Sequence, residues 1–264
     1  MKTKTNGIEI NYEIEGSGPW LTLSHSLACD LHMWDEQMPA LTKKFKVLRV
    51  DTRGHGASSA PGGAYTLEQM ADDVHGLLTA LGIRETHWAG LSMGGMIGQT
   101  FALKYPGVFR SMVLADTTCY YPPEGQSAWA DRIKLAETKG MTPIADMMIA
   151  RWFTEAYCKT GAPALARIAA SVRATPVAGF VGCCHAIPKL NLTSRLREIK
   201  CPTLVIVGEQ DPGTPVAMAQ EIHDNLPGSE LLVLPNAAHL CNIEQTQAFD
   251  AAVLGFLARH GGQE

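Results

Sequence analysis

The sequence predicts an α/β protein with a mostly parallel sheet that is covered by helices on both faces. Short apolar runs typical of buried strands alternate along the chain with longer segments of helical periodicity. Reactive side chains follow several of these strands, at the end of a parallel sheet where functional groups gather. Because the strand signal disappears from 119 to 190, we expect a helical lid there, inserted into a core domain of residues 1–118 and 191–264.

Composition narrows the class of protein. The chain has 264 residues, of which 46% are hydrophobic and 18% charged, an ordinary globular mix for one α/β domain. A formal net charge of −4 gives no basis for binding nucleic acid or an acidic membrane surface. No apolar run approaches transmembrane length, and no signal segment is apparent at the N-terminus. We therefore expect a cytoplasmic protein with neither nucleic acid nor membrane as a partner.

The cysteines also favour a reducing compartment. There are seven, an odd number scattered along the chain, which indicates free thiols rather than a disulfide framework. No cysteine or histidine pairs have zinc-site spacing, so we expect no metal. The sequence is compatible with a monomer and with a homodimer.

Three strands are expected in the first part of the core. Residues 8–14 alternate apolar and polar side chains, which predicts a half-buried strand at a sheet edge. Residues 20–23 and 46–50 are buried strands. The second of these leads into a tight glycine loop at 51–56, in which we favour a bracing role over an active one for His55.

The clearest helix begins after Thr66. Thr66 and Gln69 form a capping box, and the apolar residues from Leu67 to Leu81 fall on one face. Gly82 stands where such a helix ends. This helix is scaffold for the core.

A strained turn follows the next strand. Residues 86–89 predict a buried strand and 96–105 a helix, with Gly90-Leu91-Ser92-Met93-Gly94 between them. A strand, a G-x-S-x-G turn and a helix are the context of a nucleophile elbow, where the neighbours of Ser92 must be small. Taken alone, such a motif is more often a glycine-rich turn that happens to contain serine, and the rest of the chain has to decide.

The inserted segment follows a strand at 111–115. It holds several proline and glycine breakers and amphipathic helical pieces. Its large apolar side chains could roof a pocket or simply pack the lid onto the core. They are Trp129, Met141, Met147, Met148, Trp152 and Phe153.

The sheet resumes at 202–208 and ends with a strand at 230–234, with a helix at 216–226 between them. Asp211 follows the first of these strands, and His239 lies in the loop after the second. A closing helix carries Phe249, Val253, Phe256 and Leu257 on one face and is expected to end near Gly261-Gly262.

Ser92, Asp211 and His239 therefore each follow a predicted buried strand, and parallel strands bring such positions together. The three residue types suit acyl transfer: Ser92 attacks a carbonyl, His239 moves its proton, and Asp211 orients His239. Glu209 and Asp116 are the alternative acids, and Asp116 is the better of the two because it also ends a strand.

The loop after the strand at 20–23 can contribute to the same centre. We expect the backbone N–H groups of Leu27 and Met93 to form an oxyanion hole. His25 could act as a base, but a histidine at a strand end is more often structural.

These motifs resemble those of the α/β hydrolases over nearly the whole chain and, more narrowly, those of the 3-oxoadipate enol-lactonases. The elbow and the Arg53-Gly54-His55-Gly56 loop are common to many α/β hydrolases. The more specific matches are Ser26-Leu27, Asp30-Leu31, Met33-Trp34, Arg151-Trp152-Phe153-Thr154, Gly182-Cys183-Cys184, Ala186-Ile187, Ala238-His239-Leu240 and Asn242-Ile243-Glu244. His25, Ala28 and His185 depart from the family pattern near the expected site, which leaves the substrate lactone open.

The resemblance implies a serine hydrolase that opens a small carboxylated enol lactone without a cofactor. Arg132 and Arg151 are candidates for holding the carboxylate, although solvated surface charges are the alternative. The pocket residues that we expect are His25, Trp129, Arg132, Met148, Trp152, His185 and Leu240.

Other functions remain compatible with the sequence. A general carboxylesterase on short esters could use the same triad, with perhydrolysis as a side activity. A non-catalytic receptor of the same fold would require an idle triad.

Overall fold

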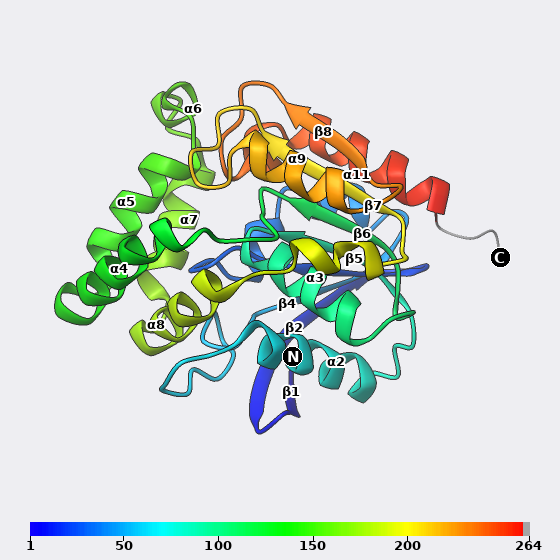
Figure 1. The fold of residues 1–264 in the computed structure, drawn as a ribbon, viewed down its shortest axis with the longest axis horizontal. Helices are drawn as coiled ribbons and strands as arrows, with labels where there is room; N and C mark the ends of the chain where they lie inside the picture. The colour runs from blue at the N-terminus through cyan, green and yellow to red at the C-terminus, as the bar shows by residue number, and fades with distance from the viewer. Residues whose placement is uncertain (261–264) are drawn as a thin grey trace.

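The computed structural model of the protein describes residues 1–260 and contains one eight-stranded sheet (Figure 1). The strand order is β1-β2-β4-β3-β5-β6-β7-β8. The first two pairings are antiparallel, and every pairing from β4–β3 onward is parallel. The strands are β1 (Lys2–Thr5), β2 (Ile8–Gly16), β3 (Trp20–Ser24), β4 (Lys46–Val50), β5 (Thr86–Leu91), β6 (Phe109–Ala115), β7 (Thr203–Gly208) and β8 (Glu230–Leu234).

The predicted α/β class with a mostly parallel sheet is confirmed. Each strand expected from the sequence is present, and β1 is an addition that the sequence did not indicate. The chain leaves β3 toward β4 on one side, whereas β5 and β6 continue on the other side of β3. The ends of β3 and β5 therefore border the point at which the strand order reverses, where open α/β sheets bind ligands.

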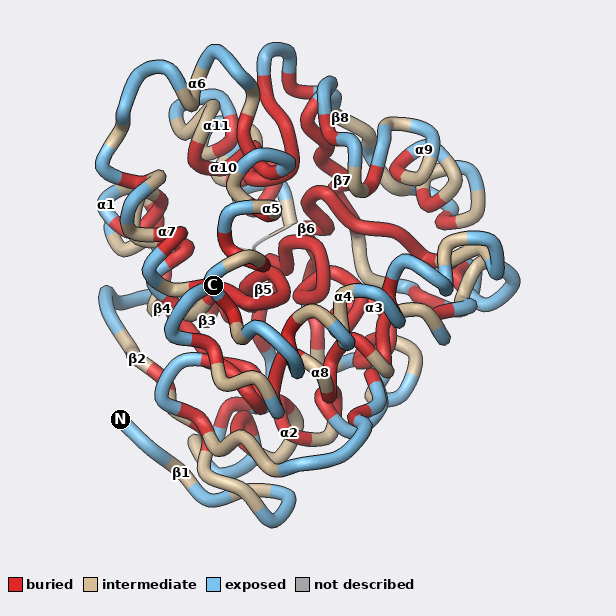
Figure 2. Tube along the Cα trace, turned by 90° about the vertical axis from the view of Figure 1, so that its left-hand side faces the viewer, coloured by how far each residue is buried: buried red, intermediate tan, exposed pale blue. Residues whose placement is uncertain are grey.

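Helices cover the sheet. Figure 1 shows α2, α3 and α9 in front of the sheet and α11 behind it. The central strands are buried along most of their length, as the red segments of Figure 2 show. The core helices are η1 (Leu31–Trp34), α1 (Met38–Leu41), α2 (Leu67–Ala80), α3 (Met93–Lys104), η4 (Thr193–Glu198), α9 (Val216–Asn225), α10 (Cys241–Glu244) and α11 (Thr246–His260). Gly261 and Gly262, where the closing helix was expected to end, lie outside the described residues.

Between β6 and β7 the chain forms a group of helices at one end of the sheet (Figure 1). Tyr120 and Asn191 pair in an isolated antiparallel bridge, so this helical segment between β6 and β7, called the insertion below, has its two ends close together at its base. Its elements are η2 (Pro123–Gly125), α4 (Gln126–Lys139), α5 (Thr142–Trp152), α6 (Glu155–Lys159), α7 (Pro163–Ala174), α8 (Val177–Ala186) and η3 (Ile187–Lys189).

No single helix among residues 1–260 is long and apolar enough to cross a membrane. Helix α7 and residues 177–189 reach the required length and composition only together, and the chain bends by 91° between them.

The capping box of α2 is present as the sequence predicts. The Thr66 hydroxyl accepts a hydrogen bond from the Gln69 N–H at 3.0 Å, and the Gln69 side chain accepts one from the Thr66 N–H at 3.0 Å. Two N–H groups that the first turn of a helix leaves without partners are thereby satisfied.

Thr66→Ala should therefore destabilise the fold by about 1 kcal/mol, because it removes an N-cap oxygen. For a chain of this size the melting temperature should fall by about 3 °C, measured by thermal denaturation. Thr79→Ala is the matched control: the Thr79 hydroxyl bonds back to the His75 carbonyl on an exposed face of the same helix. Equal losses from both variants would contradict a capping role for Thr66.

Candidate active site

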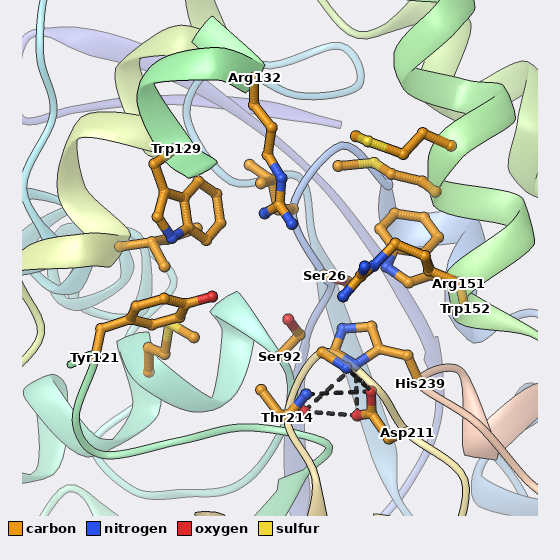
Figure 3. A pocket seen from close by; sticks show the side chains of 16 residues that line it. Ser26, Ser92, Tyr121, Trp129, Arg132, Arg151, Trp152, Asp211, Thr214 and His239 are labelled. Carbon is orange, nitrogen blue, oxygen red and sulfur yellow. Dashed lines mark hydrogen bonds and ion pairs between the residues drawn. The ribbon is translucent and has the colours of Figure 1, made fainter. Parts of the chain in front are cut away.

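A cavity lies between the helical insertion and the carboxyl ends of the strands, with about 660 Å³ of empty space including its mouth (Figure 3). Its floor comes from the core: Ser26, Leu27, Ser92, Met96, Asp211, Gly213, Thr214 and His239. Its walls and roof come from the insertion and its last turn: Tyr121, Trp129, Arg132, Met147, Met148, Arg151, Trp152 and Ile187.

Ser92 occupies a strained turn between β5 and α3. Its φ of 54° and ψ of −113° lie where side chains other than glycine are disfavoured. The turn is held by two hydrogen bonds: the Ser92 N–H donates to the Ala115 carbonyl at 2.8 Å, and the Thr117 hydroxyl donates to the Ser92 carbonyl at 2.7 Å. The expected strand–turn–helix context is therefore present.

The small residues around Ser92 are required by close packing. A Cβ atom on Gly90 would lie 2.2 Å from the Gly94 carbonyl oxygen, and one on Gly94 would lie 2.2 Å from the Ser24 carbonyl oxygen. Real Cβ atoms do not approach backbone oxygen so closely, so alanine at either position would displace the turn.

His239 and Asp211 form a buried pair at the floor of the cavity. His239 Nδ1 lies 2.7 Å from Asp211 Oδ2, and both residues are at least 95% buried. Asp211 also accepts hydrogen bonds from the Thr214 hydroxyl at 2.6 Å and from the Gly213 N–H at 2.7 Å. These contacts fix the carboxylate and direct Nε2 of His239 away from it.

The pair shifts the acidities of both groups. Burial by itself would raise the pKa of Asp211, but His239 and the donors around the carboxylate lower it to about 2. Burial by itself would lower the pKa of His239, but the charge and hydrogen bond of Asp211 raise it above the usual 6.5. A histidine with such a partner is suited to accept a proton from a nearby hydroxyl.

Ser92 and His239 line the same cavity from adjacent loops (Figure 3). Within residues 1–260 no hydrogen bond joins the Ser92 hydroxyl to His239, and in free enzymes this contact is often longer than in complexes.

The sequence profile of the α/β-hydrolase fold matches residues 19–246. The chain belongs to the α/β-hydrolase family. It is 37% identical to 3-oxoadipate enol-lactonase 2 of Acinetobacter baylyi, over 96% of this chain and 94% of that protein. The crystal structure of the enol-lactonase from Burkholderia xenovorans superimposes with a TM-score of 0.94 at 38% identity, covering 98% of this chain and all of that one. The structure of a malate-bound thermophilic esterase from Thermogutta terrifontis superimposes with a TM-score of 0.93 at 30% identity, covering 98% of each chain.

In this hydrolase, two buried histidines form hydrogen bonds with the backbone of the loop that follows β3 and hold it in place. His25 Nδ1 lies 2.7 Å from the Ser26 carbonyl, and its Nε2 accepts the Thr52 N–H at 3.0 Å. His55 Nε2 accepts the Ala28 N–H at 2.9 Å, and burial beside His25 lowers the pKa of His55 to about 3. Both ring nitrogens of each histidine are thus engaged by backbone.

Leu27, a predicted oxyanion donor, lines the cavity between these braced residues, and Met93 begins α3 directly after Ser92. The N–H groups of a first helical turn have no partners within the helix, so the Met93 N–H is available to a ligand. The placement is compatible with the proposed oxyanion hole.

Four of the seven pocket residues named from the sequence line the cavity: Trp129, Arg132, Met148 and Trp152. The other three do not. His25 turns under the loop to bond backbone, Leu240 is fully buried at the start of α10, and His185 lies on α8 outside the lining. Met141 and Phe153 are buried without reaching the cavity, so these two pack the insertion.

The alternative acids are placed differently from Asp211. Glu209 is exposed, and its carboxylate accepts a hydrogen bond from the Asn236 N–H at 3.4 Å. Asp116 is fully buried, accepts the Gly208 N–H at 2.8 Å, and has its pKa raised well above the usual value by burial and by nearby Asp211. Among the described residues the carboxylate that hydrogen-bonds His239 is that of Asp211, not that of Asp116 or Glu209.

Several lining residues were not expected from the sequence. Tyr121 precedes the first helix of the insertion, Met96 lies on the first turn of α3, and Ile187 lies just after α8. Thr214 was missed although it follows Asp211 by three residues, a spacing at which a hydroxyl can bond a carboxylate.

The pH dependence of kcat/KM should report the Asp211–His239 pair. The predicted role of His239 as a base needs a neutral imidazole, so kcat/KM should fall as the pH drops through the raised pKa of that group, above 6.5. Asp211→Asn removes the charge that raises this pKa, so the acidic limb should move to lower pH and kcat should fall about 10⁴-fold.

Glu209→Gln is the control for this measurement and should leave the profile unchanged. Full activity of Asp211→Asn, with loss in Asp116→Asn, would assign the acid to Asp116 instead.

Proposed function

We propose that this hydrolase opens a small carboxylated enol lactone similar to 3-oxoadipate enol-lactone, with Ser92, His239 and Asp211 as its catalytic triad. One observation carries the proposal: a single cavity has a serine, a histidine and an aspartate at its floor and two guanidinium groups near its roof. The 37% identity to an enol-lactonase supports the same substrate class.

In the first half of the reaction His239 takes the proton of the Ser92 hydroxyl as Oγ attacks the lactone carbonyl. The carbonyl oxygen becomes an oxyanion within reach of the Leu27 and Met93 N–H groups. The ring C–O bond then breaks, and the enol oxygen leaves with the proton from His239. Because the substrate is cyclic, the leaving group remains tethered to the acyl group on Ser92.

In the second half a water molecule gives its proton to His239 and attacks the acyl carbonyl. The bond to Ser92 Oγ breaks, and the proton returns from His239 to Ser92. The product is the enol of the open-chain diacid, which tautomerises to the keto diacid as its O–H proton is lost and a proton adds to carbon. All proton transfers of the two hydrolytic steps use side chains of the chain itself, so the reaction requires no cofactor.

The substrate carboxylate would be held by Arg132 and Arg151. Both guanidinium groups reach toward the space above Ser92 (Figure 3). Arg132 lies over the Trp129 ring at 4.5 Å, and Arg151 makes a 3.3 Å hydrogen bond to the Pro212 carbonyl. Neither has a carboxylate partner among the ion pairs of residues 1–260, so both positive charges are available to an anion.

We also propose that residues 119–190 act as a lid over a core of residues 1–118 and 191–264. The lining residues of the insertion are mostly apolar, so closing them over the cavity would exclude water from the reacting carbonyl.

The seven free cysteines support the expected cytoplasmic location.

A general carboxylesterase is the second candidate function, with perhydrolysis as a possible side activity of the same triad. The likeness to a thermophilic esterase, at 30% identity over 98% of the chain, favours it. The two candidates differ in whether the arginines contribute to substrate binding.

Ser92→Ala should abolish hydrolysis of both p-nitrophenyl acetate and enzymatically generated 3-oxoadipate enol-lactone, a loss on the order of 10⁶-fold in kcat. For the wild type, kcat/KM for the lactone should exceed that for the ester by several orders of magnitude. Ester turnover without lactone turnover would leave a carboxylesterase. Unchanged activity in Ser92→Ala would show that Ser92 is not the nucleophile.

Arg132→Gln should raise KM for the carboxylated lactone by about 10- to 100-fold, because a hydrogen bond to a charged group is lost. Hydrolysis of uncharged p-nitrophenyl acetate should change little. Arg173→Gln is the matched control, since Arg173 is on the insertion but pairs with Asp146 at 2.9 Å outside the cavity. An equal effect on both substrates would mean that Arg132 supports the lid and does not bind a carboxylate.

A further inference from the structure

The hydroxyl of Ser26 is a buried polar group without a partner inside the cavity. Ser26 is only 1% exposed, and its Oγ makes no hydrogen bond within residues 1–260. The residue lines the cavity together with Ser92 and His239 (Figure 3). A buried hydroxyl that is left unpaired is unusual and costly, so its retention calls for an explanation.

The rest of Ser26 is firmly held. Its N–H donates to the Met33 sulfur at 3.4 Å, and its carbonyl accepts the Cys29 N–H at 3.1 Å. His25 Nδ1 lies 2.7 Å from the same carbonyl oxygen. The backbone is therefore fixed on both sides of the side chain, and only the hydroxyl has unused hydrogen-bonding capacity.

Two buried serine hydroxyls elsewhere in residues 1–260 are paired within the protein. Ser58 donates to the Asp51 carbonyl at 2.7 Å, and Ser111 lies 2.8 Å from His87 Nδ1. Ser26 differs from these two in facing the cavity, where the missing partner would be a ligand.

Ser26 also directly precedes Leu27. The Oγ of a serine and the N–H of the next residue are separated by only a few covalent bonds, so both can point at one acceptor. The acceptor that becomes strongly negative in this cavity is the substrate carbonyl oxygen, during attack by Ser92.

We propose that the Ser26 hydroxyl is a third donor of the oxyanion hole, beside the N–H groups of Leu27 and Met93. The inference rests on the proposed acyl-transfer function of the site. The hydroxyl is a catalytic donor whose hydrogen bond is weak to the neutral carbonyl and strong to the oxyanion. It therefore acts on kcat more than on KM.

The test compares Ser26→Ala with Ser26→Thr, which keeps a hydroxyl. With p-nitrophenyl acetate, Ser26→Ala should lower kcat by about 10²-fold with little change in KM, and Ser26→Thr should keep most of the activity. Phenylboronic acid, which forms a tetrahedral adduct with a serine nucleophile, should lose affinity for Ser26→Ala. The melting temperature of Ser26→Ala should not fall, because no bond within the protein is lost.

Ser111→Ala is the matched control: it should lower the melting temperature, since it removes the partner of His87, and leave kcat unchanged. A loss in kcat below about five-fold for Ser26→Ala would overturn the proposal. So would a rise in KM alone, or equal losses in the Ala and Thr variants with a lowered melting temperature. Failure of the proposed function is recognised separately, because Ser92→Ala would then retain activity.

Discussion

The parallel pairing of β3 with β5 determines where the groups of the candidate active site can stand. Ser24 aligns with Gly90 in this pair, so the loop that leaves β3 lies beside the turn that leaves β5. The first loop carries Leu27, and the second carries Ser92. The proposed oxyanion donor and the proposed nucleophile come from distant parts of the sequence, and this pairing places them side by side before any side chain is considered.

Close packing then fixes the distance between the two loops. Because Gly94 has no side chain, its backbone can approach the Ser24 carbonyl, and the start of α3 is pressed against the end of β3. The loop after β3 is supported from the other side by His25 and His55, which bond backbone N–H groups with unprotonated Nε2. The low pKa of His55 keeps that support intact at neutral pH. Backbone donors held in this way need little rearrangement when charge develops on a substrate.

The helical insertion is tied to the loop that carries His239, the proposed base. One oxygen of the Glu244 carboxylate accepts the N–H and hydroxyl of Thr154, just after α5, and the other accepts the Ala238 N–H at 2.6 Å, beside His239. The Leu240 N–H donates to the Trp152 carbonyl at 3.0 Å. The end of α5 therefore cannot shift without breaking hydrogen bonds to the neighbours of His239. A movement of the proposed lid would change the position of His239.

The sequence was most informative where function depends on local backbone. Ser92, Asp211 and His239 each follow a strand with a clear apolar pattern, and such positions can be located without knowing any contact. Side-chain direction is not local in this sense. His25 was counted as a pocket residue because of its position in the chain, yet its ring turns to backbone of the neighbouring loop. Tyr121 and Ile187 reach the cavity from segments whose placement depends on how α4 and α8 pack.

Hydrogen-bond satisfaction is a further property that no motif reveals. Ser26 was recognised in the sequence only as half of a family-like Ser-Leu pair, and nothing in that pair distinguishes it from a serine bonded to its own loop. The distinction requires all neighbours of the hydroxyl at once: Met33, Cys29 and His25 take up the backbone of Ser26 and leave Oγ to the cavity. Folding removes this hydroxyl from water without giving it a partner in the protein. The proposed partner is the carbonyl oxygen of a bound substrate, whose hydrogen bond would offset the free energy of burying the hydroxyl. That oxygen is present only when substrate is bound.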